Sequence, residues 1–288
     1  MSRSRPDLTT LRLGVVSYLN MLPVVHGLEE LGRSGLGDSR LDVVSLPPGP
    51  MADLMENGEL DVGMVPVATA FAHPEWSIVG HSMIGSRGKV KSVLAMGMEP
   101  PEQWTSLHLD SQSRTSNAFI QVLLNRRFDV KPNLLNPVPL ENWSPPEKTA
   151  PGEAHLLIGT RALRWRDHWL ERGGHVIDLG EEWTKWTGLP FVYAAWAARP
   201  GIDARAWIAC VEELKDRNLK RLEEIVPTWP GLENERLTPA QAVDYLTTNI
   251  HFDLDESAIW GMRRFYEEGL SLGLFPRGWR YQPSKSIA

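Results

Sequence analysis

Short apolar runs of strand length alternate with segments of helical spacing along the first part of the chain. The runs at 13–16, 41–46 and 60–65 predict strands, and the segments that follow them at 22–31, 51–57 and 67–72 predict helices. Strands that alternate with helices through short connections form a parallel sheet covered by helices.

The pattern changes after residue 77 and then starts again. Strand-like segments at 78–83 and 90–98 precede a proline-containing break. A second α/β unit is predicted after this break. Its strands are expected at 106–109, 130–143 (with a loop), 155–159 and 176–179, and its helices at 117–127 and beginning near 160. A further strand is predicted at 191–197, joined to 176–179 by the segment 181–190, and the spacing from Ile202 on is helical.

These elements predict an α/β fold of two lobes with a helical C-terminal region. Lobe 1 is expected to comprise 11–97 and 191–288, with lobe 2, residues 98–190, inserted into it. Two strands then have to cross between the lobes, and 93–98 and 191–197 are the candidates. Such an arrangement places a ligand cleft between the lobes and allows hinge closure around it.

Four polar turns stand at predicted strand ends and could meet in that cleft: 17–20, 86–92, 110–116 and 186–190. In the third turn Ser113, Thr115 and Ser116 stand with Arg114 at a helix N-terminus, where free N–H groups and the helix dipole favour an anion. Arg114 could bind a carboxylate through two hydrogen bonds. The alternative is that the hydroxyls only cap the helix and Arg114 is solvated.

Residues of the other turns also have two interpretations. Asn20 stands where a helix N-cap belongs, before Pro23 in the first helical turn. Ser92 lies within the apolar run V-K-S-V-L, where a lone serine is usually satisfied by a neighbouring backbone group. Tyr18 and Trp186 could be core residues or an aromatic wall of the cleft, and the sequence does not decide.

Composition and charge narrow the classes of partner. The 288 residues carry a formal net charge of −6, which disfavours nucleic acid or an anionic membrane as a main partner but not a small anion. The single cysteine, Cys210, excludes an intrachain disulfide and a cysteine metal cluster. No secretory signal and no apolar run of about 20 residues is found, so a cytoplasmic location is expected.

Motifs for metals and cofactors are not found. The sequence contains no H-E-x-x-H, EF-hand loop, G-x-S-x-G, P-loop or G-x-G-x-x-G, and the eight histidines have no metal-ligand spacing. Neither a metal nor a cofactor is therefore expected, and any chemistry has to use side chains, backbone dipoles and the substrate itself.

Several motifs, in the same order along the chain, resemble the chorismate dehydratase family of menaquinone biosynthesis by the futalosine route. They are G-V-V-S-Y-L-N-M-L-P at 14–23, G-E-L-D-V-G-M-V-P-V at 58–67, K-S-V-L at 91–94, L-D-S-Q-S-R-T-S at 109–116, L-L-I-G at 156–159 and D-L-G-E-E-W-T-K-W-T-G-L-P-F-V-Y-A-A-W at 178–196. The combination of S-R-T-S with T-G-L-P-F-V is fairly specific for this family.

The resemblance implies a type II periplasmic-binding-protein-like fold used as an intracellular hydro-lyase. The implied reaction removes water from chorismate to give 3-[(1-carboxyvinyl)oxy]benzoate and needs no cofactor. The protein is expected to be a monomer or a homodimer. The catalytic positions implied are Asn20 and Ser92. The substrate-binding positions expected are Ser17, Tyr18, Ser113, Arg114, Thr115, Ser116, Thr187 and Gly188. At Ile158-Gly159-Thr160 the family usually has Asp in the third place, where it either caps the next helix or touches the ligand; we expect the cap, a role that Thr160 can fill.

Three other functions compete with this one. A solute-binding protein without chemistry would share the fold but is normally exported. The sister enzyme of the same route makes 1,4-dihydroxy-6-naphthoate, but S-Y-L-N-M-L-P resembles the dehydratase. The effector domain of a transcription regulator would need a helix-turn-helix domain ahead of the first strand, for which residues 1–10 are too few.

Overall fold

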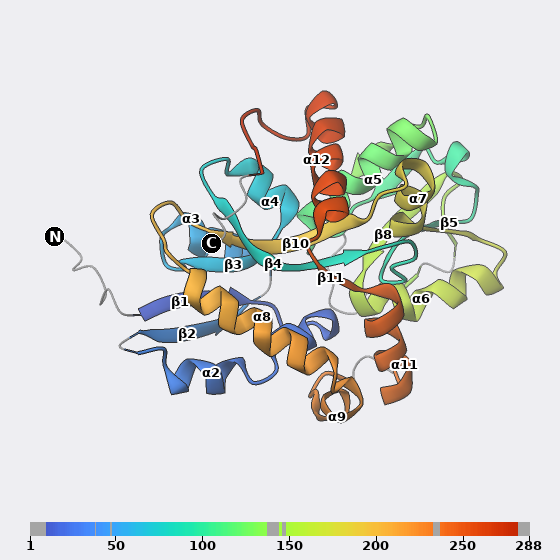
Figure 1. Cartoon of the computed structure of the whole chain (residues 1–288). Helices are drawn as coiled ribbons and strands as arrows, with labels where there is room; N and C mark the ends of the chain where they lie inside the picture. The colour runs from blue at the N-terminus through green and yellow to red at the C-terminus, as the bar shows by residue number, and fades with distance from the viewer. Residues whose placement is uncertain are drawn as a thin grey trace.

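The strands form two sheets, as the computed structural model of the chain shows (Figure 1). The structure describes residues 10–37, 39–46, 48–136, 144–145, 148–232 and 237–281. Within these ranges one sheet has six strands in the order β11-β4-β10-β3-β1-β2, and the other has five in the order β7-β6-β8-β5-β9. The predicted α/β class is therefore confirmed.

The six-stranded sheet contains β1 (Thr10–Val15), β2 (Arg40–Ser45), β3 (Val62–Pro66), β4 (Ser77–Ser86), β10 (Phe191–Ala198) and β11 (His251–Asp253). The predicted parallel pairing holds for β1, which pairs with both β2 and β3. The other half of this sheet is antiparallel, because β10 lies between β3 and β4 and runs against both.

The helices of the first part of the chain are η1 (Leu19–Met21), α1 (Leu22–Val25), α2 (Leu28–Ser34), α3 (Pro48–Glu56) and α4 (Val67–Ala72). The single helix predicted at 22–31 was wrong. Gly27 has φ +82°, a left-handed conformation that glycine adopts without steric cost, and it separates α1 from α2.

The five-stranded sheet contains β5 (Val93–Gly97), β6 (Ser106–His108), β7 (Asn133–Leu135), β8 (Glu153–Ile158) and β9 (His175–Asp178). Its helices are η2 (Pro101–Gln103), α5 (Arg114–Arg127), α6 (Gly159–Glu171) and α7 (Leu179–Thr187). The connection predicted at 181–190 is mostly helix, because Asp178 caps α7 by accepting from the N–H of Glu181. Of the strand and loop predicted at 130–143, residues 137–143 lie outside the described residues.

The C-terminal part is helical, as predicted. It contains α8 (Arg205–Leu219), α9 (Leu222–Ile225), η3 (Val226–Thr228), α11 (Pro239–Asp244), the π-helical turn η4 (Tyr245–Asn249) and α12 (Glu256–Ser271). A capping box is present at Thr238, whose side chain accepts from the N–H of Gln241. No helix among the described residues is both long and apolar enough to cross a membrane.

The chain passes from one sheet to the other in short segments. It leaves the six-stranded sheet after β4, and β5 already pairs with β8 and β9 in the other sheet. It returns after α7 into β10. Of the two candidate crossover strands, 93–98 thus lies in the five-stranded sheet and 191–197 in the six-stranded one. The domain boundaries at 97/98 and 190/191 stay predictions.

The larger of two apolar core clusters among the described residues is shared by both sheets, and the smaller one lies between the five-stranded sheet and α6. Phe119 on α5 stacks on Phe191 of β10, with ring centroids 3.5 Å apart and planes inclined by 5°. Phe265 of α12 packs against the same pair, edge-on to each. These contacts fix the helix start of α5 against the six-stranded sheet, next to the cleft described below.

Candidate active site

A cleft of about 210 Å³ opens where strands of both sheets end. The segment that follows β1, residues of β3 itself, and the segments that follow β6 and β8 contribute to its lining. Tyr245 and Ile250 from the C-terminal part complete the wall. Carboxyl ends of parallel strands are the usual ligand-binding edge of α/β sheets. Of the predicted site residues, Tyr18, Asn20, Ser92, Ser113 and Ser116 line this cleft.

The turn after β1 carries Tyr18 and Asn20 into the cleft. Asn20 lies inside η1, and the residue that precedes α1 is Met21, which makes no side-chain cap. The interpretation of Asn20 as an N-cap was therefore wrong, and its half-buried side chain faces the cavity. The Tyr18 hydroxyl donates to Oε1 of Gln112 at 3.2 Å, so the turn after β1 contacts the turn after β6 directly.

Ser92 is held by a side chain rather than by a backbone group. Its hydroxyl, with the residue 4% exposed, accepts a hydrogen bond from the Tyr245 hydroxyl at 2.8 Å. The preceding residue, Lys91, has φ +62°, which is rare for a residue with a side chain. Asp178 stabilises this turn by accepting from the N–H groups of Val90 at 3.1 Å and Lys91 at 2.7 Å. Burial raises the pKa of Asp178, and these hydrogen bonds act in the opposite direction.

The start of α5 presents two of its hydroxyls to the cleft. Ser113 is the N-cap and accepts from the N–H of Ser116 at 3.0 Å, while its own hydroxyl donates to the Ser116 hydroxyl at 2.8 Å. Thr115 points into the core instead, where it accepts from the N–H of Ala68 and donates to the carbonyl of Tyr193. The capping interpretation is thus correct for Ser113, and Ser113 and Ser116 line the cavity as well.

The arginine at the cleft is Arg161, not the predicted Arg114. The Arg114 side chain is 53% exposed, lies 3.9 Å from Asp53 and does not line the cavity. Arg161, on the first turn of α6, lines it and donates to Oδ2 of Asp110 at 2.8 Å. The buried Asp110 also accepts from the N–H groups of Gln112 and Ile158.

The remaining predicted contacts do not line the cavity. Ser17 shares a hydrogen bond with Ser45 on the neighbouring strand. Thr187 donates to the carbonyl of Trp183, and Gly188, with φ +71°, ends α7. Trp186 packs against the core and is not among the residues that line the cleft. The prediction of Thr160 as the helix cap was wrong, because Thr160 lies within α6, whose N-cap is Ile158; the Thr160 side chain lies outside the described residues.

Sequence reasoning missed two of the three tyrosines that line the cleft, Tyr193 and Tyr245, and also Gln112. Burial raises the pKa of Tyr193 well above its usual range, so its hydroxyl stays protonated. None of the described residues that line the cleft is a carboxylate or a histidine. The cleft therefore offers one cation and a set of neutral hydrogen-bonding groups.

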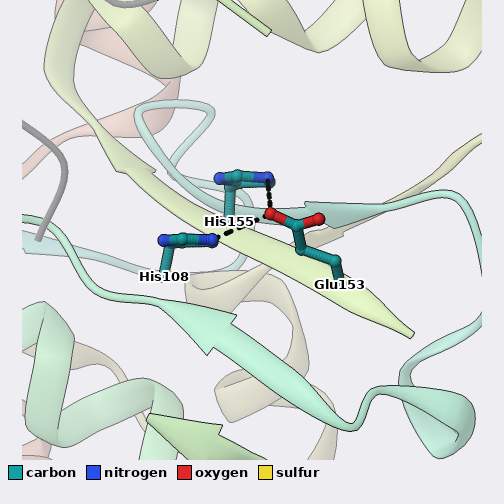
Figure 2. Close-up of side chains that lie close together, drawn as sticks. All are labelled: His108, Glu153 and His155. Atoms are coloured by element: carbon teal, nitrogen blue, oxygen red, sulfur yellow. Dashed lines mark hydrogen bonds and ion pairs between the residues drawn. The ribbon is translucent and has the colours of Figure 1, made fainter. Parts of the chain in front are cut away.

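A possible metal-ligand set lies outside the cleft lining. His108, Glu153 and His155 bring one ligand atom each to within 4.8 Å of one another (Figure 2). Burial and the neighbouring His108 lower the pKa of His155 to about 4. Because the two histidines are far apart in the sequence, spacing could not reveal this cluster.

Comparison with known proteins identifies the family. Residues 11–270 match the menaquinone biosynthesis family. The chain belongs to this family. It is 26% identical over 284 residues to the chorismate dehydratase of Thermus thermophilus, covering 91% of this chain and 95% of that protein.

Solved structures confirm the predicted periplasmic-binding-protein-like fold. The periplasmic aliphatic sulphonate binding protein of Escherichia coli aligns with a TM-score of 0.63 and 13% identity, over 98% of this chain and 96% of that one. A Candida albicans protein with the generic periplasmic binding protein fold aligns with a TM-score of 0.58 and 12% identity, over 98% and 100%. At such identities the likeness concerns the fold alone.

Proposed function

We propose that this protein is a chorismate dehydratase, a hydro-lyase that removes water from chorismate to give 3-[(1-carboxyvinyl)oxy]benzoate. The main support for this proposal is the positive charge of the cleft. Its lining includes Arg161 and, among the described residues, no carboxylate that would repel an anion. Chorismate carries two carboxylates. The similarity to a protein named chorismate dehydratase supports the same function.

Arg161 and the start of α5 are the groups that recognise the anion. The guanidinium is fixed by Asp110, which leaves its other N–H groups for a substrate carboxylate. The free N–H groups at the start of α5 lie beside Ser113 and Ser116 and carry the positive end of the helix dipole. One carboxylate of chorismate binds Arg161, and the other binds at this helix start.

Asn20 and Ser92 orient the ring and stabilise the charge that develops on it. The substrate loses a ring proton and its ring hydroxyl, the two leave as water, and the ring becomes aromatic, so the reaction is strongly downhill. Since no carboxylate or histidine lines the described cleft, a carboxylate of the substrate itself takes the ring proton and passes it to the departing hydroxyl, which leaves as water. The enzyme mainly binds, orients and excludes water.

Substitutions of the two orienting residues test this function. Asn20→Ala and Ser92→Ala should each lower turnover of chorismate by about a hundredfold, the scale of one lost stabilising group in an active site. Ser17→Ala is the matched control, because Ser17 stands on the same turn but bonds to Ser45 outside the cleft. Absorbance of the aromatic product gives the rate. Near-normal turnover in both cleft variants would reject the assignment.

The competing function is that of a binding protein, which would bind chorismate in this cleft and release it unchanged. The periplasmic sulphonate-binding relative shows that the fold also serves binding proteins. Binding measured by calorimetry without product formation would favour that alternative over the enzyme.

A further inference from the structure

Two neighbouring strands place two histidines and a glutamate on one face of the five-stranded sheet. β6 and β8 run parallel, and His108 is the register partner of His155. Glu153 precedes His155 by two residues, and residues two apart on a strand share a face. Figure 2 shows the three side chains turned toward one another.

Both imidazoles meet the same carboxylate oxygen. Oε1 of Glu153 lies 2.8 Å from Nε2 of His108 and 3.5 Å from Nε2 of His155. Ligand atoms around a tetrahedral Zn²⁺ stand about 3.3 Å apart, given Zn–N and Zn–O distances near 2.0–2.1 Å. The two distances to Glu153 bracket that value, and all three ligand atoms lie within 4.8 Å of one another.

The surroundings hold the set in place on one side and leave it open on the other. The His155 side chain is 5% exposed, with the indole of Trp169 5.8 Å from its ring, whereas His108 and Glu153 are about one-fifth exposed. Oε2 of Glu153 accepts from the N–H of Ala150 at 2.8 Å, which orients the carboxylate. Water can therefore reach the open side and complete a coordination shell.

The histidine rings have to turn before both can bind one ion. They stack with centroids 4.6 Å apart and planes inclined by 4°, so their Nε2 lone pairs run parallel rather than converge. Nδ1 of His108 has no hydrogen-bond partner among the described residues, so rotation of that ring breaks only its bond to Glu153. The metal bonds replace that hydrogen bond.

We propose that His108, Glu153 and His155 bind a divalent transition-metal ion such as Zn²⁺, separate from the cleft. Two imidazoles and one carboxylate form a ligand set that suits zinc, with water in the fourth position. The ion joins β6 to β8. Asp110, which holds Arg161, follows His108 by two residues, and Ile158, whose N–H donates to Asp110, follows His155 by three. The site therefore stabilises the two strands that lead into Asp110 and into α6, which carries Arg161.

Zinc uptake by untagged, EDTA-treated and dialysed protein tests the site. Calorimetry with Zn²⁺ should give one equivalent per chain, and the melting temperature should rise with added zinc, because the ion binds the folded chain. His108→Ala and Glu153→Gln should weaken zinc binding by at least about tenfold and remove the thermal shift. Glu153→Gln keeps the side-chain shape, and its metal-free melting curve shows whether it folds.

His73→Ala and His175→Ala are the matched controls. His73 contacts Glu56 and Glu75 and so offers another imidazole beside carboxylates, while His175 is an exposed histidine of the same five-stranded sheet. Both should bind zinc as the parent protein does. Absence of uptake by the parent protein, or uptake unchanged in His108→Ala and Glu153→Gln, would overturn the proposal. Turnover of chorismate is a separate measurement, so either proposal can fail alone.

Discussion

The arginine of the cleft owes its position to a buried carboxylate. Asp110 is fully buried at its side chain and accepts hydrogen bonds from two backbone N–H groups as well as from Arg161. A guanidinium held in this way loses little side-chain entropy when an anion binds. Arg114 has no such support, since its side chain is half-exposed beside Asp53.

Arg161→Ala should reduce kcat/KM for chorismate by about ten- to a hundredfold, mostly through KM, because a hydrogen bond between charged groups contributes about 1.5–3 kcal/mol. Arg161→Lys should recover part of the loss, since lysine keeps the charge but not the fork of donors. Steady-state kinetics with Arg114→Ala as control checks this. A larger KM effect at Arg114 than at Arg161 would show that the anion binds elsewhere.

The sequence could indicate some site residues and not others. Asn20, Ser92, Ser113 and Ser116 stand in turns that the pattern places at strand ends, and they do line the cleft. Arg161 could not be found in this way, because Asp110 lies 51 residues away and only the pairing of β6 with β8 brings the two together. Thr187 and Gly188 also stand at a strand end but serve to end α7.

At the scale of elements, Asp178 joins α7 to the segment that carries Ser92. One carboxylate caps α7 and accepts from two N–H groups of the turn before Ser92. Asp178→Ala should lower the free energy of unfolding by about 2–4 kcal/mol, from the lost cap and two unpaired N–H groups. Urea denaturation measures it. A loss below about 1 kcal/mol would mean that other groups hold the turn.

In the same turn before Ser92, substitution of Lys91 by glycine is predicted not to destabilise the fold, in contrast to Asp178→Ala. Its φ of +62° is costly for a residue with a side chain and natural for glycine. Lys91→Gly should therefore leave the free energy of unfolding unchanged or raise it by about 1 kcal/mol, since relief of strain offsets the added freedom of the unfolded chain. Lys91→Ala, which keeps the strain, is the control in the same urea experiment. A clear destabilisation by glycine would contradict strain at this position.

His251 on β11 contacts Arg87, the residue that follows β4, as a neutral hydrogen-bond acceptor. Nε2 of His251 accepts from Nε of Arg87 at 3.1 Å, and Arg87 also pairs with Asp255. Burial and the charge of Arg87 lower the pKa of His251 below its ordinary 6.5. The unfolded chain therefore binds this proton at a higher pH than the folded chain, and the stability that neutral His251 provides is lost as pH falls below 6.5 through the folded-state pKa.

His251→Gln should accordingly reduce the loss of stability between pH 7.5 and pH 5, since glutamine can still accept from Arg87 and does not titrate. Urea denaturation at both pH values gives the slope for each protein. His175→Gln, at an exposed site of the other sheet, should keep the parent slope. An unchanged slope in His251→Gln would show that this histidine is not the group responsible.

At the scale of the whole molecule, alternation of strands and helices predicts the two-sheet α/β fold because local periodicity reports which face is buried. It could not predict that β10 lies antiparallel between β3 and β4, because that pairing joins residues more than a hundred positions apart. The core between the sheets, where Phe119 stacks on Phe191, depends on the same long-range pairing.

The shared core and the hydrogen bonds of Tyr18 with Gln112 and of Tyr245 with Ser92 hold the cleft together. The cleft presents one arginine and several neutral polar groups at the edge of both sheets. Incubation of EDTA-treated protein with chorismate, followed by mass spectrometry of the small molecules, is the most direct measurement of what this cleft does. We predict complete conversion to an aromatic product that has lost one water, abolished by Ser92→Ala together with Asn20→Ala. Chorismate that binds and returns unchanged would contradict the proposed dehydratase.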